Sequence, residues 1–360
     1  MRISILIVAL ASFMSLLAFG DSYEPLEHHT FTHDGKLREY FVHVPDDTDK
    51  SLPVVFAIHG YTSTATGFAV FHDLREHANQ NGYIVVYPQS SHFVDTRSDR
   101  PYRVTSWNML GNVTADPDAG PQCIADSYKY PCPPECGECD RCAWATCFDD
   151  FGYFEKLLDA VESDYNTDTT RYYALGMSNG GMMTLRLGCS MSGRIAAIAP
   201  VAAQMPSGFD CGPGTNLPMI HLSGGKDDTV RPDGEPGGDG FAYVSAADTT
   251  ATWAKALQCE SGPDSWETEA SGRAGLSCTA YGACAIEGQE VVSCVDPDET
   301  HNWPASRPGG AWPTCVTSQQ KDSLPEQRLC EPRTVYGPHR GMDVIWEFFS
   351  RFEMPNLDSP

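Results

Sequence analysis

The chain has 360 residues and carries 48 Asp and Glu against 24 Lys and Arg, which gives a formal net charge of −24 at pH 7. A surface this acidic repels nucleic acid and anionic membranes, so the sequence predicts neither as a partner. The charge fits an exported protein that acts on a neutral or insoluble substrate.

Residues 1–20 have the character of a secretory signal. One Arg precedes an apolar run from Ile3 to Ala18, and small residues follow at the positions that a signal peptidase reads. The run is shorter than the roughly 20 residues that span a bilayer, although an uncleaved membrane anchor is the alternative. We therefore expect a signal peptide at 1–20, a secreted, extracellular protein, and N-glycosylation at Asn112 if the secreting cell glycosylates.

Apolar runs and helical patterns alternate along the rest of the chain. Strands are predicted at 38–44, 54–59, 82–88, 171–175, 196–201, 218–222 and 288–295, and helices at 67–79, 149–165, 246–257 and 341–352. This alternation is typical of an α/β protein with a mainly parallel central sheet and helices on both faces. We expect residues 21–360 to form a single catalytic domain, which the segments 112–147 and 258–284 interrupt as cross-linked insertions.

The chain contains 14 Cys, and reducing compartments rarely maintain so many. The segment 112–147 is the Cys-rich insertion and holds six of them, namely Cys123, Cys132, Cys136, Cys139, Cys142 and Cys147. Their C-x2-C spacings also occur in zinc sites. In an exported chain with further Cys elsewhere, we expect disulfides and no metal.

Residues 171–183 read RYYALGMSNGGMM and place Ser178 on a turn between a strand and a helix. This arrangement is a nucleophile elbow, in which the strained turn holds the Ser hydroxyl clear of the backbone at a helix N-terminus. Side chains at Gly176 or Gly180 would collide with the neighbouring strand and helix. Ser178 is therefore the predicted nucleophile.

A Ser hydroxyl needs a general base, and the base needs a carboxylate that orients it. The loop SGGKDDTV follows one predicted strand and the loop DPDETHNWP follows the next, which gives the order Ser, Asp, His. His301 is the predicted base. Asp227 is the predicted acid if the first loop is a variant of H-G-x-x-D-x-x-V, and Asp228 is the alternative.

Two backbone N–H groups must stabilise the oxyanion, and we expect them from Asn179 and Tyr61. His59, at the end of the strand before Tyr61, is expected to shape the turn and not to act as the base. Trp107, Met177 and Trp303 flank the predicted site by their motif positions, so they are expected to form an apolar or aromatic substrate-binding wall, with core packing as the alternative.

The segments LPVVFAIHGYTSTATGF, SWNML, RYYALGMSNGGMMTLRLGCS, SGGKDDTV and HNWP together resemble the esterases grouped with polyhydroxybutyrate depolymerases and secreted feruloyl and acetylxylan esterases. The resemblance implies an α/β-hydrolase fold without a metal or cofactor, and triad roles for Ser178, Asp227 and His301. The chain departs from the family pattern at Ser223, where the acid loop usually has His, and at Arg231, where Pro is usual.

We therefore expect a secreted, monomeric serine carboxylesterase that hydrolyses feruloyl or acetyl esters on xylan through an acyl-enzyme. An extracellular polyhydroxybutyrate depolymerase is the first alternative, although such enzymes commonly carry a linker and a surface-binding module that this chain does not show. A peptidase of the same fold and a catalytically inert binding protein remain further alternatives.

Overall fold

The computed structural model describes residues 25–45, 50–97, 99, 101–109, 122–139, 142–206, 211, 217–305, 314–331 and 340–354. The predicted signal peptide at 1–20 and the sequon at Asn112 lie outside these residues.

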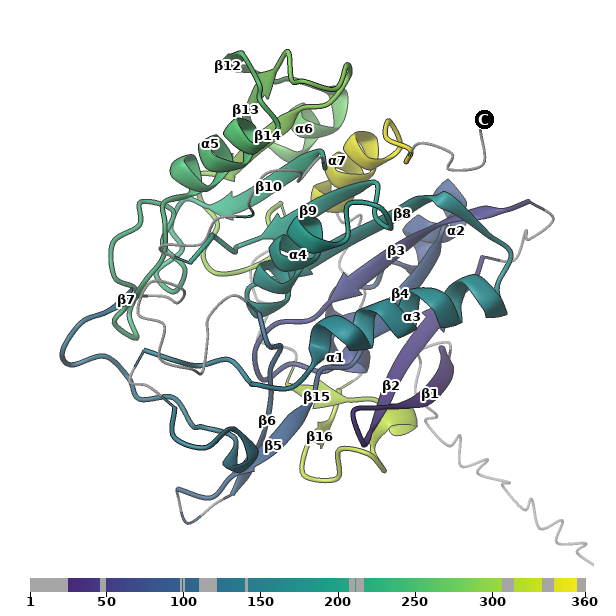
Figure 1. Ribbon diagram of the computed structural model, residues 1–360, viewed down its shortest axis with the longest axis vertical. Helices are drawn as coiled ribbons and strands as arrows, with labels where there is room; N and C mark the ends of the chain where they lie inside the picture. Colours follow the sequence, from purple (N-terminus) through teal and green to yellow (C-terminus); the bar gives the residue numbers. More distant parts are fainter. Residues whose placement is uncertain are drawn as a thin grey trace, which may run out of the picture.

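A ten-stranded sheet with the order β1-β2-β4-β3-β8-β9-β10-β14-β13-β12 forms the centre of the molecule (Figure 1). Neighbouring strands from β4 to β14 are parallel, whereas the strands at both edges pair antiparallel. The strands are β1 Glu27–His33, β2 Lys36–His43, β3 Leu52–Ile58, β4 Ile84–Pro88, β8 Thr167–Met177, β9 Ala197–Val201, β10 Met219–Gly224, β12 Ser261–Ser265, β13 Ser277–Gly282 and β14 Val291–Asp296.

Helices cover both faces of this sheet. On one face lie α3 Asp150–Asp164, α4 Asn179–Ser190 and α5 Ala246–Ala256 (Figure 1). On the other lie α1 Ala65–Phe71, α2 Arg75–Asn81, α6 Glu269–Ala274 and α7 Arg340–Phe349. Because apolar residues face a helical layer on each side, β3, β4 and β9 are buried along their whole length, which explains their unbroken apolar sequences.

In the described part of the chain, three small sheets lie outside the central one. They pair β5 His92–Asp95 with β6 Tyr102–Thr105, β7 Gln122–Cys123 with β11 Phe241–Ala242, and β15 Cys315–Val316 with β16 Arg328–Leu329. Short 3₁₀ turns occur at Pro134–Cys136 and Ser318–Gln320.

All 14 Cys form disulfides. The six Cys of the insertion pair with one another, which favours the disulfide interpretation of this cluster over zinc. The pairs are Cys123–Cys142, Cys132–Cys139, Cys136–Cys147, Cys189–Cys211, Cys259–Cys284, Cys278–Cys294 and Cys315–Cys330.

Two predictions about the fold are wrong in detail. The helix predicted at 67–79 is two helices, because His72 leaves the helical conformation with φ −121° and ψ 66° and ends α1, so that α2 begins as a new helix after Leu74. The segment 258–284 is not an insertion, because β12 and β13 extend the central sheet and the Cys278–Cys294 disulfide joins two residues paired across β13 and β14. The residues of β12 are exposed, so this edge strand carries no apolar signal.

The strand order and the turn from β8 into α4 confirm the predicted α/β-hydrolase fold, with a parallel central sheet and a disulfide-rich insertion. Within the described residues, every helix is too short or too polar to traverse a lipid bilayer.

Candidate active site

Ser178 occupies the turn between β8 and α4 with φ +56° and ψ −124°. A residue with a Cβ disfavours this conformation, so the surrounding structure must hold it in place. The Ser178 N–H donates to the Val201 carbonyl at 2.9 Å, and the Ser178 carbonyl accepts the Met182 N–H at 2.9 Å. The turn is thus fixed by the neighbouring strand and by the first turn of α4.

Glycine is required on both sides of Ser178. A Cβ at Gly176 would lie 2.4 Å from the Gly180 carbonyl oxygen. A Cβ at Gly180 would lie 2.2 Å from the Ile58 carbonyl oxygen and 2.4 Å from that of His59. Because these neighbours are backbone atoms, they cannot move aside as a flexible side chain would, and α4 can approach β3 and β8 only through glycine.

Three side chains from distant parts of the chain meet beside this turn. His301 Nε2 lies 3.1 Å from Ser178 Oγ, and His301 Nδ1 lies 2.7 Å from Asp227 Oδ2. The other carboxylate oxygen of Asp227 accepts the N–H groups of Thr229 and Val230 at 2.8 and 2.9 Å. An ionised carboxylate beside Nδ1 requires the proton there, which leaves Nε2 free to accept the Ser hydroxyl.

Backbone contacts between two loops hold Asp227 and His301 in register. The Gly225 N–H donates to the Asp296 carbonyl at 2.7 Å, and the Lys226 N–H donates to the Glu299 carbonyl at 2.9 Å. The two loops follow β10 and β14, which are parallel neighbours in the sheet. Asp227 and His301 therefore arise from adjacent carboxyl ends of strands.

The alternative acid and a further histidine, His221, lie in different surroundings. Asp228 is exposed, and its carbonyl accepts the Gly238 N–H at 2.7 Å. His221 is buried within β10 and contacts the Ala203 carbonyl through Nε2 at 2.9 Å.

His59 shapes the turn after β3. Its Nδ1–H donates to the Gly60 carbonyl at 2.8 Å, so its Nε2 accepts the Ser90 N–H at 3.1 Å. Burial lowers the pKa of His59 to about 4, although the hydrogen bond to Gly60 acts in the opposite direction. The imidazole is therefore neutral near pH 7 and is fully engaged with the backbone.

Trp107 connects the two segments that are expected to supply the oxyanion donors. The Asn179 amide oxygen accepts the Trp107 N–H at 2.8 Å, and the Asn179 amide nitrogen donates to the Trp107 carbonyl at 3.3 Å. The Trp107 indole N–H donates to the His59 carbonyl at 2.8 Å. Trp107 thus ties the first residue of α4 to the segment that leads into Tyr61, a contact that the sequence analysis did not predict.

The substrate-binding wall expected from Trp107, Met177 and Trp303 is not formed by the two indoles. Trp107 is 0% exposed and packs on Phe154, with 5.3 Å between ring centroids, and Trp303 is 1% exposed and lies against His72. Met177 is buried as well, at 5% exposed. Both tryptophans pack in the core, as the alternative prediction stated, because a fully buried indole has no exposed face that a substrate could contact.

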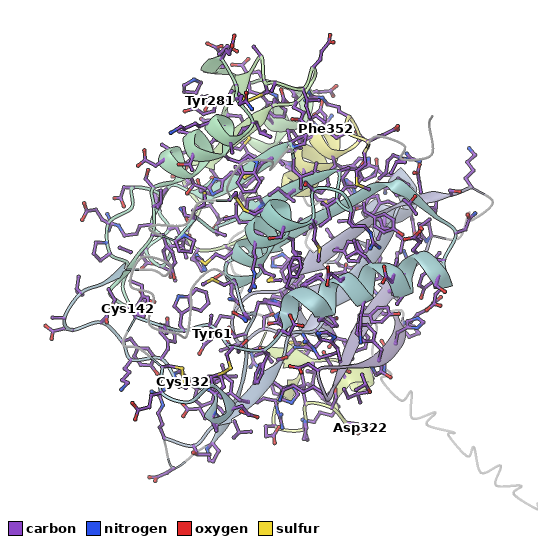
Figure 2. All side chains as sticks on the ribbon, in the orientation of Figure 1. Tyr61, Cys132, Cys142, Tyr281, Asp322 and Phe352 are labelled. Atoms are coloured by element: carbon purple, nitrogen blue, oxygen red, sulfur yellow. A yellow bond between two sulfur atoms is a disulfide. The ribbon has the colours of Figure 1, made fainter. Side chains whose placement is uncertain are left out.

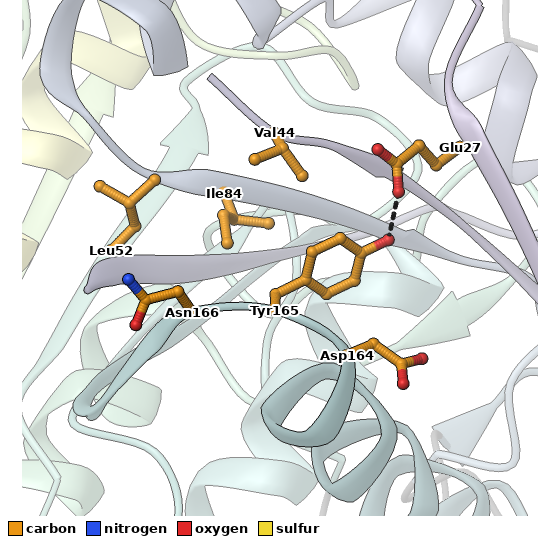
Figure 3. Close-up of a pocket in the computed structure, with 7 residues that line it drawn as sticks. All are labelled: Glu27, Val44, Leu52, Ile84, Asp164, Tyr165 and Asn166. Carbon is orange, nitrogen blue, oxygen red and sulfur yellow. Dashed lines mark hydrogen bonds between the residues drawn. The ribbon is translucent and has the colours of Figure 1, made fainter. Parts of the chain in front are cut away.

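A separate pocket of 260 Å³ lies where β3 and β4 begin, at the opposite edge of the sheet (Figure 3). The Tyr165 hydroxyl donates to the Glu27 carboxylate across it at 2.6 Å. Its lining consists of Glu27, Val44, Leu52, Ile84, Asp164, Tyr165 and Asn166. None of the predicted site residues lines this pocket.

Comparison with known proteins finds relatives among esterases. The chain is 27% identical to feruloyl esterase B of Piromyces equi, over 41% of this chain and 28% of the relative. It is 24% identical to acetylxylan esterase A of Emericella nidulans, over 40% of this chain and 35% of the relative. It is also 24% identical to poly(3-hydroxyalkanoate) depolymerase C of Paucimonas lemoignei, over 50% of this chain and 36% of the relative.

The matched regions span about a third of the length of these relatives. No family model matches the chain. Among solved structures, an acetyl xylan esterase from Aspergillus awamori has a TM-score of 0.48 and 15% identity, with 77% of this chain and 95% of that chain covered. The relatives of this chain are thus proteins named as feruloyl esterase, acetylxylan esterase and polyhydroxyalkanoate depolymerase.

Proposed function

We propose that the protein is a serine carboxylesterase in which Ser178, His301 and Asp227 form the catalytic triad. The observation that carries this proposal is the unbroken hydrogen-bond chain from Ser178 Oγ through the imidazole to the buried carboxylate. A neutral imidazole takes the Ser proton during attack, and the carboxylate stabilises the imidazolium that forms.

The reaction proceeds in two stages. Ser178 Oγ attacks the ester carbonyl while His301 Nε2 accepts its proton, and the imidazolium then protonates the departing alcohol. The acyl-enzyme is hydrolysed when His301 activates a water, which releases the acid and restores the Ser hydroxyl. The N–H groups of Asn179 and Tyr61 are assigned to the oxyanion in both stages.

The substrate class that we propose is an ester of the plant cell wall, namely feruloyl or acetyl groups on xylan. The relatives named feruloyl esterase and acetylxylan esterase support this choice. A relative named poly(3-hydroxyalkanoate) depolymerase makes polyester hydrolysis the second candidate. We further propose that the protein is exported, because seven disulfides are suited to an oxidising compartment.

Substrate profiling tests the proposal. Purified protein is incubated with p-nitrophenyl acetate, methyl ferulate, acetylated xylan and polyhydroxybutyrate, and acid release is measured with a Ser178→Ala variant as the control. We expect turnover of acetyl or feruloyl esters that is lost in the variant and survives a chelator. A folded protein without turnover of any ester would favour the binding-protein alternative, and turnover of the polyester alone would favour the second candidate.

A further inference from the structure

We propose that the exposed rings of Tyr102 and Tyr128 form a docking surface for the neutral polysaccharide chain that bears the ester. This proposal rests on the proposed function, because the platform would bind the polysaccharide part of the substrate whose ester the proposed active site hydrolyses. The surface, which we call the tyrosine platform, consists of these two side chains. One comes from the β5–β6 hairpin and the other from the Cys-rich insertion.

The platform is exposed in a protein whose other aromatic rings are mostly covered. Tyr102 is 40% exposed and Tyr128 is 51% exposed. Arg97 links the two segments: it donates to the Asp95 carboxylate, opposite Tyr102 across β5 and β6, at 3.0 Å, and to the carbonyl of Lys129, next to Tyr128, at 2.8 Å. A phenol hydroxyl both donates and accepts hydrogen bonds, so each ring of the platform also offers a polar group to a sugar hydroxyl.

A series of ring contacts runs from the platform toward the candidate active site. The Tyr128 and Tyr130 centroids are 4.9 Å apart, those of Tyr130 and Tyr61 are 5.4 Å apart, and those of Tyr61 and Trp144 are 5.6 Å apart. Each pair meets edge to face, which is a favoured aromatic geometry. Tyr61 is two residues beyond His59, whose carbonyl lies against the nucleophile elbow, so the series reaches the proposed oxyanion loop.

Tyr61 also carries a polar group without a partner. Its hydroxyl oxygen is buried and has no hydrogen-bond partner among the residues that the structure describes. Burial raises the pKa of Tyr61 well above its usual range, so the hydroxyl keeps its proton and remains a donor. Because the Tyr61 ring contacts Tyr130, and Tyr130 contacts Tyr128, this unpartnered donor lies between the platform and the oxyanion loop.

The platform is held rigidly relative to the site. The Tyr128 N–H donates to the Asp239 carbonyl at 2.8 Å, and the Tyr130 hydroxyl donates to the Asp239 carboxylate at 2.7 Å. Three disulfides cross-link the insertion, and β7 pairs with β11 in the segment after Asp227. Figure 2 shows Tyr61 on the same side of the molecule as Cys132 and Cys142 of the insertion. A surface that is already rigid loses little conformational entropy when it binds a polymer, so less of the binding free energy is lost.

The chemistry around the platform suits a sugar chain. The ring of a tyrosine offers an apolar face to the C–H groups of a pyranose, while its hydroxyl remains available to the solvent side. The ion pairs Arg97–Asp95 and Arg103–Glu326, with N–O distances of 3.0 and 2.7 Å, involve residues of the hairpin that carries Tyr102 and provide donors and acceptors for sugar hydroxyls. A polyester has no donors for these groups to bind, and the net charge of −24 disfavours an anionic polymer.

Binding without turnover is the first test. The catalytically disabled Ser178→Ala protein is mixed with insoluble arabinoxylan, and the bound fraction is compared with that of the same protein carrying Tyr102→Ala and Tyr128→Ala. We expect the dissociation constant to rise about tenfold, which corresponds to the loss of about 1.4 kcal/mol. Tyr102→Phe with Tyr128→Phe should retain most of the binding, because the rings remain.

The control variant is Tyr281→Ala, in a tyrosine on β13 at the far end of the molecule from Tyr61 (Figure 2). It should bind arabinoxylan as the Ser178→Ala parent does. Equal binding by the parent and the double alanine variant overturns the proposal. It is also overturned if the parent binds polyhydroxybutyrate powder in place of arabinoxylan, because the platform would then serve a polyester.

Kinetics separate this proposal from the proposed function. In the active protein, the double alanine change should lower kcat/KM on acetylated or feruloylated xylan about tenfold more than on p-nitrophenyl acetate, mainly through KM. An equal loss on both substrates contradicts a docking role. If no ester is hydrolysed by any variant, the esterase proposal fails while the arabinoxylan binding result still decides the platform.

Discussion

The Trp107 indole N–H donates to the His59 carbonyl at 2.8 Å, and the backbone of Trp107 is hydrogen-bonded to the Asn179 side chain. One buried residue therefore sets the spacing between the start of α4 and the segment that leads to Tyr61. Oxyanion donors act only if they are fixed before the reaction, because reorganisation during the reaction would cost the stabilisation they provide.

Trp107→Phe should consequently lower kcat by about one to two orders of magnitude on a short ester, with a smaller change in KM. The variant keeps an aromatic ring in the core and removes the hydrogen bond to His59. The matched control is Trp253→Phe, whose indole N–H donates to the Leu217 carbonyl at 2.9 Å and whose ring is equally buried. If both variants lose kcat to the same extent, the effect is one of stability and the positioning role is refuted.

Asp227→Asn should reduce kcat by about three to four orders of magnitude, because an amide permits the wrong imidazole tautomer. Asp228→Asn should change kcat by less than about twofold, since that side chain is exposed to solvent. Initial rates on p-nitrophenyl acetate measure both. The reverse pattern would assign the acid to Asp228.

Gly180→Ala should destabilise the fold by about 3 kcal/mol or prevent folding, because its Cβ would overlap two carbonyl oxygens of β3 and the residue after it. Gly193→Ala should change the free energy of unfolding by less than about 1 kcal/mol, since its Cβ would meet no atom within 4 Å. Denaturant unfolding of both variants measures the difference. A Gly180→Ala protein as stable as the parent would show that α4 can move away from β3.

Stability should fall as the pH decreases from about 6.5 to about 4. Burial lowers the pKa of His59 and of His221 to about 4, whereas an unfolded chain titrates near the ordinary value of 6.5. Between these values the unfolded state binds more protons, so acid favours unfolding by up to about 1.4 kcal/mol per pH unit for each imidazole. Above pH 6.5 both states are neutral and this contribution is complete.

Urea unfolding at several pH values between 4.5 and 7.5 tests this expectation. His221→Gln keeps an N–H donor for the Ala203 carbonyl but has no group that titrates in this range. The slope of the unfolding free energy against pH should therefore decrease by the contribution of one imidazole. An unchanged slope in this variant would mean that other groups cause the acid sensitivity.

The central strands were predictable because a parallel strand covered on both faces must be apolar throughout, as the sequences of β3, β4 and β9 are. The elbow was predictable because only Gly tolerates the contacts at positions 176 and 180, and both glycines are within two residues of Ser178 in the sequence. The edge strands β1 and β12 were missed, since residues exposed on an edge show no such pattern.

The sequence by itself predicted the proposed nucleophile, the order of its proposed partners and the cross-linked character of the chain, because turn geometry, chain order and Cys content can be read without knowing which distant residues meet. Only the tertiary structure decided that Asp227 and not Asp228 contacts His301, that Trp107 lies in the core, and that Tyr61 joins a series of rings from the Cys-rich insertion. These facts depend on hydrogen bonds and burial between segments far apart in the chain, and no local pattern encodes which distant atoms will meet.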